Sequence, residues 1–549
     1  MKWMREPQLH ESLDLAIPDI LSSQKENGQF GTEPWISTDQ NVLLALSAAW
    51  SLEESAYYQS EQILDAIILG GDALIAAQDD AGMFTFRKKD HSTWGQIYMP
   101  WVYSRWMRAF GIVRDAMESE AKDRWTEALL QGYEGIAQTA IGHVHNIPTH
   151  HAMGLYCAGE VFDRTDWKKQ AHDFMHQVMA EQSPHGWWAE HMGPVVAYNF
   201  VYVESLGVYY KMSGDEAVLD ALLRSAQYHS GCVYPDGSMV ETVDGRNPYH
   251  TGVRLGNIGF CYTPEGRGFL AQQHRVFLAQ GKTFDADYAA HMLLYGADGE
   301  AIETAAVQEQ HVYQMGDQAL MMRHRPWFVG LSVFTVPIPQ NRWGQDRQNF
   351  VSVFHDSVGL IVGGGNTKLQ PLWSTFTVGD TSLLAHNAGD EDPDFSAREG
   401  LIHVPECAKI DACKDRPSLI LAYGDEDCRV TVRPENDDEL TLVLAASANT
   451  GLPVEAHVTL IPHHGGSIAC QNTQIGILSD DAFVWDDAEW IEHAGWQLTV
   501  PKGSRVIWPA LPHNPYRKDG AAMIEEGLLV VAVPFDDHTK RQELKLRVT

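Results

Sequence analysis

The chain has 549 residues, of which 44% are hydrophobic and 21% charged, and its formal net charge is −33. This length exceeds what one hydrophobic core organises and predicts about two to four domains, while the composition excludes global disorder. The electrostatic field of a protein with this negative net charge repels nucleic acid and anionic membrane surfaces, so we expect neither as a partner.

The N-terminus, MKWMREPQLHESLDLAIPDIL, has no basic segment followed by an apolar run and a small-residue cleavage site. No apolar run is long enough to predict a membrane span. The seven cysteines are scattered, without a zinc-binding spacing. We therefore expect a cytoplasmic protein with reduced thiols.

From the start to about residue 325, apolar residues recur at helical spacing. Examples are Leu43, Leu46 and Trp50; Ile63 and Ile67; and Val218, Leu222 and Ala226. Clusters of glycine, proline and aspartate separate these segments at intervals of roughly 50 residues, as in a series of helical hairpins. Such hairpins form a superhelix or a closed ring. We favour the ring, an α/α toroid, because the loops are rich in aromatic and polar residues that would converge on one cleft.

After residue 326 the apolar period changes to two, which predicts β-strands. The clearest runs contain Cys428, Val430 and Val432; Leu440, Leu442 and Leu444; and Leu544, Leu546 and Val548. We therefore predict a multidomain α+β protein, with an N-terminal α/α toroid catalytic domain over residues 1–325 and a C-terminal antiparallel β-sandwich over residues 326–549.

Three constellations stand out in the helical half, and the first is HVHNIPTHHAMGLYCAGEVF at 143–162. It places four histidines and Asn146 within nine residues, just before a helical pattern that Thr149 is positioned to cap. A metal site and a purely structural role are alternatives. We favour Asn146 and His150 facing a cleft, where they would stabilise a carboxylate or oxyanion, with His151 in substrate binding.

The second constellation is SPHGWWAEHMGPVVAYNFVYVESLGVYY at 183–210, in which a loop gives way to a helix near Val195. Tyr198 and Tyr202 are four residues apart and share a helix face. With His191 in the loop before them, they suit proton transfer. The alternative is that the tyrosines belong to the core. Two tryptophans in the same loop are candidates for substrate binding, Trp187 and Trp188.

The third constellation is the glycine- and proline-rich stretch 234–260, a long loop of the kind that is usually functional. Arg246 is a candidate carboxylate ligand, unless it pairs internally with Asp244 or Glu241. Further candidates for substrate binding are Glu241, Tyr249, His250 and Arg254, together with Trp94 in an aromatic segment upstream.

Three stretches resemble the polysaccharide lyases of the chondroitin/hyaluronate lyase and heparinase II/III-like group. THHAMGLYCAGEVF is similar to the helix that holds an Asn or Asn-His pair, EHMGPVVAYNFVY to the His-to-Tyr stretch, and DGRNPYH to the loop with a substrate-binding arginine. The β half has no HSHADQN-like run, so the resemblance implies no zinc. We predict no metal and no cofactor.

The resemblance implies β-elimination on a uronate-containing oligosaccharide, with an unsaturated uronate as product. Asn146 or His150 would neutralise the uronate carboxylate, His191 or a tyrosine would remove the adjacent proton, and Tyr198 or Tyr202 would protonate the leaving oxygen. Arg246 would bind the acid group.

Three other functions remain open. A glycoside hydrolase on the same toroid would use two carboxylates, from Asp39, Asp80, Glu190, Glu204 and Glu241. A sugar epimerase would use histidine pairs, from His150, His151, His191 and His250. A non-enzymatic carbohydrate-binding protein would need the tryptophans but no acid–base set.

Overall fold

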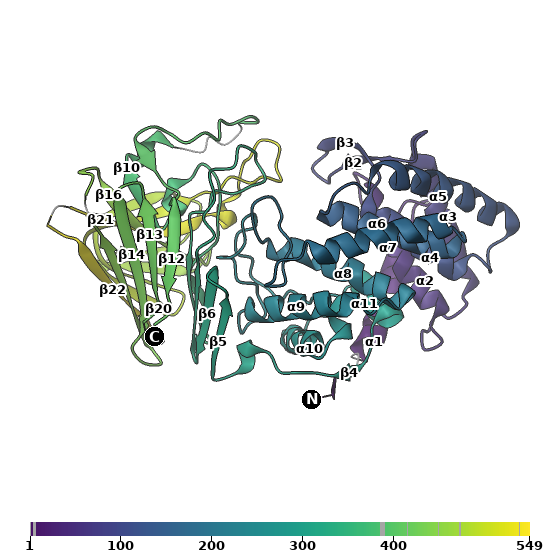
Figure 1. The fold of residues 1–549 in the computed structure, drawn as a ribbon, viewed down its shortest axis with the longest axis horizontal. Helices are drawn as coiled ribbons and strands as arrows, with labels where there is room; N and C mark the ends of the chain where they lie inside the picture. Colours follow the sequence, from purple (N-terminus) through teal and green to yellow (C-terminus); the bar gives the residue numbers. More distant parts are fainter. Residues whose placement is uncertain are drawn as a thin grey trace. The chain divides into compact units, whose positions relative to one another are not determined.

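The structure is a computed structural model that describes residues 2–3, 7–384, 390–413, 416–447, 449–471, 474–536 and 538–549. Its backbone divides into two compact units (Figure 1). Unit 1 comprises Met1–Trp188, Ala197–Tyr228 and Leu255–Glu303, and unit 2 comprises Ala189–Val196, His229–Arg254 and Thr304–Thr549. We predicted a single boundary after residue 325. Instead, the last division lies earlier, and two short segments of the helical half belong to unit 2.

Eleven α-helices occur among the described residues, most of them in unit 1. They are α1 Gln8–Ser22, α2 Val42–Ser51, α3 Glu61–Ala77, α4 Pro100–Val113, α5 Ser119–Thr139, α6 Asn146–Val161, α7 Thr165–Ala180, α8 Val196–Ser213, α9 Val218–Gly231, α10 Pro264–Ala279 and α11 Ala286–Tyr295. The predicted helical periodicity around residues 43–50, 63–67 and 218–226 is confirmed by α2, α3 and α9.

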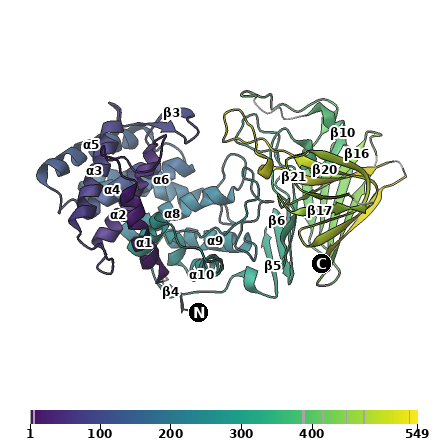
Figure 2. The same cartoon turned by 180° about the vertical axis from the view of Figure 1, so that it is seen from behind.

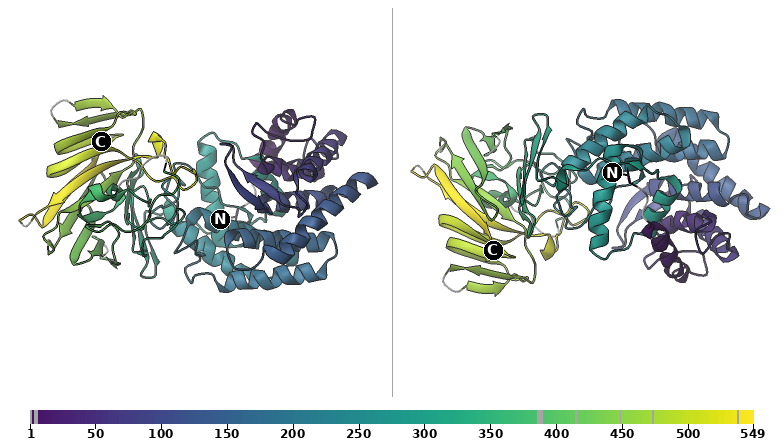
Figure 3. Two further views of the ribbon diagram at one scale, coloured as in Figure 1. Left: turned by 90° about the horizontal axis from the view of Figure 1, so that it is seen from above. Right: turned by 90° about the horizontal axis from the view of Figure 1, so that it is seen from below.

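The inner helices of unit 1 form a closed ring (Figure 3). Helix α11 packs on α2, α2 on α4, and α4 on α6. Tyr156 of α6 meets Tyr209 of α8 edge to face at 5.1 Å, and Glu204 of α8 lies 3.4 Å from His291 of α11. These contacts return to the starting helix, so the ring predicted from the sequence is confirmed as an α/α toroid.

Burial separates the inner helices from the outer ones. Helices α4 and α6 are buried on nearly every side, including polar positions such as Arg105 and His150. Helix α5 buries only one stripe, which contains Trp125, Leu129 and Tyr133 and has the spacing of an amphipathic helix. Polar groups inside α4 and α6 must therefore find partners within the ring.

Unit 2 is dominated by antiparallel strands. The strands of the described residues are β1 Lys2–Trp3, β2 Phe84–Arg87, β3 Thr93–Ile97, β4 Gly299–Glu300, β5 Gln310–Met315, β6 Ala319–His324, β7 Trp327–Ser332, β8 Val351–His355, β9 Gly359–Val362, β10 Phe376–Gly379, β11 Leu401–Ile402, β12 Cys407–Asp411, β13 Ser418–Tyr423, β14 Glu426–Pro434, β15 Glu439–Ala446, β16 Val454–Leu460, β17 Ser467–Cys470, β18 Gln474–Ile477, β19 Phe483–His493, β20 Trp496–Ala510, β21 Leu528–Phe535 and β22 Arg541–Val548. Strands β5 to β22 form one connected sheet.

The three strands predicted most clearly from the sequence are neighbours in this sheet. Val432 of β14 faces Leu442 of β15, and Leu442 faces Leu544 of β22. The alternating apolar side chains therefore meet on one face. Additional pairings fold the sheet on itself: β16 pairs with β10, β9 and β21 (Figure 2). One hydrophobic cluster, to which nearly all these strands contribute, fills the interior. The predicted antiparallel β-sandwich is confirmed.

No helix among the described residues combines the length and the apolar character needed to cross a membrane.

Close packing between outer helices predicts a large effect of one added methyl group. A Cβ at Gly71 of α3 would lie 1.9 Å from the ring of Trp125 in α5, whereas a Cβ at Gly111 of α4 would lie 3.1 Å from a Val161 methyl. We expect Gly71→Ala to destabilise the protein by about 2 kcal/mol, as overpacked cores do. Gly111→Ala should be close to neutral, since alanine gains about 1 kcal/mol of helix propensity.

Thermal unfolding of the two variants checks this expectation. Equal midpoints for Gly71→Ala and Gly111→Ala would contradict the packing seen between α3 and α5.

Candidate active site

Helix α6 begins within the first constellation. Asn146 is its first residue and is buried, and His145 precedes it in extended conformation. Thr149 is not the cap predicted from the sequence. It lies inside the first turn, where its hydroxyl donates to the carbonyl of His145 at 2.7 Å. The helix starts four residues earlier than the capping pattern indicated, and this places Asn146 at the positive end of the helix dipole.

His150 lies inside the ring with serine hydroxyls beside both of its nitrogens. Its Nε2 is 2.9 Å from Ser104 Oγ of α4, and its Nδ1 is 3.4 Å from Ser205 Oγ of α8. Burial lowers the pKa of His150 to about 3, although Glu204 partly opposes this. His151 is equally buried, and burial lowers its pKa to about 4. Both imidazoles are therefore neutral near pH 7.

A buried ion network surrounds His150. The guanidinium of Arg105 in α4 donates to both carboxylate oxygens of Asp287 in α11, at 2.8 and 2.6 Å. Asp285 caps α11 by accepting from the amide of Asp287, which places that carboxylate in the first turn. The fork geometry of arginine and carboxylate makes this one of the strongest pair types available.

The same network reaches α8. His291 of α11 lies 3.4 Å from Glu204 and 3.6 Å from Asp287. Burial on its own would raise the pKa of Glu204, but His291 and Arg105 outweigh it and hold that pKa well below its usual value. Charged groups of α4, α8 and α11 thus stabilise one another inside the toroid. The sequence patterns did not predict this network. Two arginines within the otherwise apolar segment 100–113, Arg105 and Arg108, were an indication of buried charge there.

The two predicted tyrosines of α8 have different environments. Helix α8 begins at Val196, as expected. Tyr198 is half-buried, whereas Tyr202 is 1% exposed and stacks on Trp188 with ring centroids 4.8 Å apart. The Trp188 indole donates to the carbonyl of Val178 at 2.7 Å. Trp188 and Tyr202 therefore form core, which corrects the expectation that Trp188 offers a ring face to a sugar.

The other two tryptophans remain accessible. Trp187 is half-buried. Trp94 is also half-buried, in the hairpin of β2 and β3, and Lys88 Nζ lies 5.0 Å from its ring centroid. Both keep a partly exposed indole that suits a sugar platform.

His191 lies in the segment of unit 2 that leads into α8. Its side chain is exposed, and its φ of 60° lies in the left-handed region, which is uncommon for residues other than glycine. The neighbouring turn is closed by a hydrogen bond from the Glu190 amide to the Gly193 carbonyl at 2.9 Å.

Arg246 is held on several sides within unit 2. Its Nη1 donates to Glu190 Oε1 at 2.7 Å, and its guanidinium lies 4.9 Å from the ring centroid of Trp343 and 5.4 Å from that of Tyr516. The internal ion pair considered from the sequence thus exists, but its partner is Glu190 rather than Asp244 or Glu241. Asp244 instead accepts backbone hydrogen bonds, including one from the Arg246 amide at 2.9 Å.

Glu241 lies within the predicted loop 234–260 and is buried. Its carboxyl group accepts from the Tyr234 hydroxyl at 2.8 Å and from the Gly364 amide at 3.0 Å. Burial raises its pKa to about 7. A Cβ at Gly363, where φ is 141°, would lie 2.3 Å from Glu241 Oε1, so the approach of the two segments requires glycine there. Glu241 therefore supports the loop instead of facing a substrate.

The outer part of this loop lines a pocket of about 200 Å³ within unit 2. Tyr249 and His250 contribute to its wall, together with Trp373 and Glu526. Arg254 is exposed, and its amide donates to the carbonyl of Gly237 at 3.1 Å.

The predicted residues thus belong to both units. Unit 1 contains Trp94, Asn146, His150, His151, Trp187, Trp188, Tyr198 and Tyr202, whereas unit 2 contains His191, Glu241, Arg246, Tyr249, His250 and Arg254. Within unit 1, contacts join His150 to α4 and α8, and Trp188 to Tyr202.

Three solved structures share this fold over almost the whole chain. Streptomyces coelicolor A3 chondroitin AC lyase, in complex with chondroitin sulphate, is 13% identical, with a TM-score of 0.55 over 99% of this chain and 80% of that one. Heparinase III is 12% identical, with a TM-score of 0.55 over 100% of this chain and 85% of that one. A chondroitinase AC lyase, studied in oligosaccharide complexes, is 10% identical, with a TM-score of 0.53 over 98% and 82% of the two chains.

The chain has the fold of these lyases. No protein-family model and no curated protein matches the sequence. The likeness therefore lies in the arrangement of the α/α toroid and the antiparallel β unit, and it confirms the architecture that the sequence resemblance implied.

Burial of His150 predicts an acid-sensitive fold. The folded protein holds its pKa at about 3, against 6.5 when unperturbed, so the unfolded chain binds more protons between these values. Stability contributed by neutral His150 is thus present above about pH 6.5 and is lost as the pH falls below it. We expect His150→Gln, which keeps a polar partner for Ser104, to flatten the stability-versus-pH curve in this window by up to about 1.4 kcal/mol per pH unit.

Urea unfolding between pH 4 and pH 7 measures the slope. An unchanged slope in His150→Gln would show that this histidine does not titrate differently in the two states.

Proposed function

We propose that the protein is a polysaccharide lyase that cleaves a uronate-containing oligosaccharide by β-elimination. The observation that supports this most directly is the half-buried Tyr198 in the first turn of α8, immediately after the loop that contains His191. The fold shared with chondroitin AC lyase and heparinase III adds to it.

The reaction requires three chemical tasks. The proton on the carbon next to the uronate carboxylate must be acidified, which happens when hydrogen-bond donors offset the carboxylate charge. A base must then remove that proton. As the new carbon–carbon double bond forms, the bond to the glycosidic oxygen breaks, and an acid must protonate the leaving oxygen.

Asn146 is the proposed neutralising group. Its side-chain amide is uncharged, and its place at the first position of α6 adds the positive end of the helix dipole. His150 is less suitable, because both of its nitrogens already lie beside serine hydroxyls. We therefore assign His150 and His151 to positioning α6.

Tyr198 is the proposed acid and His191 the proposed base. Tyr202 is 1% exposed and its ring stacks on Trp188, so we assign it to the core. The exposed imidazole of His191 is a suitable proton acceptor. Arg254, which is exposed, is proposed to meet the acid groups of the glycan, which the protein's net charge of −33 would otherwise repel. Arg246 is buried and paired with Glu190, so we assign it to holding the loop in place.

The glycoside hydrolase alternative finds less support in the environments of its candidate carboxylates. Asp39 pairs with Lys89 at 2.6 Å, and Glu190 pairs with Arg246 at 2.7 Å. Glu204 belongs to the network inside the toroid. These three carboxylates pair with neighbouring side chains and stabilise the fold. Acid–base chemistry by Tyr198 and His191 is therefore the better-supported proposal.

If the reaction is a β-elimination, its product contains a chromophore. Incubation with a panel of uronate oligosaccharides should produce the ultraviolet absorbance of a conjugated unsaturated uronate, because the new double bond lies next to the carboxylate. Chain cleavage without this absorbance would establish hydrolysis. A changed sugar without cleavage would establish epimerisation. Either result would refute the lyase assignment.

The two tyrosines of α8 provide a matched pair of variants. We expect Tyr198→Phe to lower kcat by about 100-fold or more, since removal of a general acid costs about that much. Tyr202→Phe keeps the ring stacked on Trp188 and should leave kcat within a few-fold of the wild-type value. Steady-state kinetics on the active oligosaccharide distinguish the two, and full activity in Tyr198→Phe would rule out its role as the acid.

A further inference from the structure

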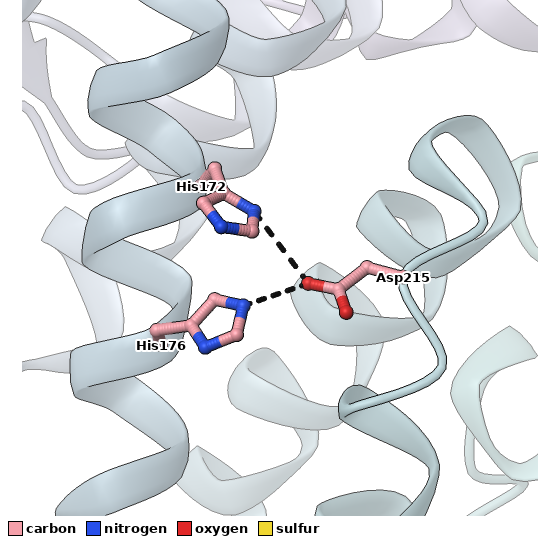
Figure 4. A group of neighbouring side chains, drawn as sticks. All are labelled: His172, His176 and Asp215. Atoms are coloured by element: carbon pink, nitrogen blue, oxygen red, sulfur yellow. Dashed lines mark hydrogen bonds and ion pairs between the residues drawn. The ribbon is translucent and has the colours of Figure 1, made fainter.

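Two histidines and one aspartate form a cluster on the outer surface of unit 1 (Figure 4). His172 and His176 lie one turn apart on α7, with ring centroids 4.3 Å apart. Asp215 follows the end of α8 and points toward both rings. The two imidazoles are 47% and 43% exposed and the carboxylate 17%, so the cluster is open to solvent. It lies outside the residues proposed for the elimination reaction.

The spacing of the three ligand atoms suits a small cation. His176 Nε2 lies 2.9 Å and His172 Nδ1 3.6 Å from Asp215 Oδ2, and all three ligand atoms lie within 4.8 Å of one another. In a tetrahedral zinc site with bonds of about 2.0–2.2 Å, neighbouring ligand atoms are about 3.3 Å apart. Small side-chain rotations therefore reach the coordination geometry.

Hydrogen bonds position the carboxylate. The Tyr209 hydroxyl donates to Asp215 Oδ2 at 2.9 Å and also lies 2.7 Å from His172 Nδ1, and the Ala217 amide donates to Asp215 Oδ1 at 3.1 Å. A hydrogen-bonded outer shell of this kind is typical of metal ligands.

We propose that His172, His176 and Asp215 form a binding site for a divalent transition-metal ion, with water completing a four-coordinate shell. Two imidazoles and one carboxylate are a ligand set that zinc and similar ions accept. A bound ion would join α7 to the turn between α8 and α9 and would stabilise unit 1 in proportion to its occupancy. The expectation of no metal rested on the constellation at 143–162 and on the missing HSHADQN-like run in the β half, and neither concerns this pair of histidines.

Zinc is the probe for a direct test. Protein freed of metal with a chelator is titrated with ZnCl₂ in competition with a chromophoric chelator, and we expect one equivalent to bind at this site. His172→Ala and His176→Ala should each weaken that binding at least tenfold. Tyr209→Phe removes the hydrogen bond to Asp215 and should weaken it less. Zinc should raise the thermal midpoint of the wild-type protein but not of either histidine variant.

The control variant is His464→Ala. His464 Nε2 also lies 2.9 Å from a carboxylate, that of Asp480, but among the described residues no third His, Cys, Asp or Glu completes a ligand cluster with this pair. This variant should bind zinc as the wild-type protein does. The same measurements with Co²⁺ report on the ligands, because thiolate coordination would give an intense near-ultraviolet band that a site of nitrogen and oxygen ligands lacks.

The proposal fails if His172→Ala and His176→Ala bind zinc as tightly as the wild-type protein. It also fails if the cobalt spectrum shows thiolate ligands. Absence of zinc binding to the wild-type protein would refute the proposal as well. Since none of these readouts involves a glycan, they are independent of the proposed lyase activity.

Discussion

The pairing of the buried Arg105 with the partly exposed Asp287 is the interaction on which the toroid most depends. A guanidinium inside a helical ring is tolerable only when a carboxylate meets it with good geometry, because an uncompensated buried charge costs several kcal/mol. Here the carboxylate comes from the last helix of the ring, 182 residues along the chain. The ion pair therefore stabilises the closed ring, in addition to the apolar contacts between neighbouring helices. Glu204 and His291 extend the same compensation to α8.

This network also lies next to two candidate residues of α6, His150 and Asn146. His150 lies between Ser104 of α4 and Ser205 of α8, two helices that the network joins, and burial keeps its imidazole neutral. Asn146, one turn earlier, is placed at the helix end by the same packing. The polar interior thus orients the start of α6, where the proposed function needs a neutral hydrogen-bonding group.

Local patterns in the sequence were sufficient for the elements and for much of the fold. The period of two in residues 428–432, 440–444 and 544–548 identified strands that are direct neighbours. It could not show which residue meets which across long separations. Arg105 and Asp287 are an example, and so is the partner of Arg246, which is Glu190. Each pairing depends on the closed fold rather than on nearby residues.

Aromatic residues were the poorest predictors of which side chains belong to the candidate site. Trp187 and Trp188 are adjacent and chemically identical, yet one is half-buried and the other is stacked inside the core on Tyr202. Tyr198 and Tyr202 differ in the same way. Composition and spacing do not distinguish a ring that supports the core from one that meets a ligand, since both uses favour the same side chains. The exposed fraction of each ring makes the distinction.

The path of the chain through the two units has a consequence for dissecting the protein. Segments 189–196 and 229–254 leave the helical unit and return to it, so the backbone passes between the units several times. A fragment ending after residue 303 would retain Glu241 and Tyr234 but lose Gly364 and Phe354, which bond and stack with them. Neither unit can therefore be excised with a single cut as an autonomous folding module.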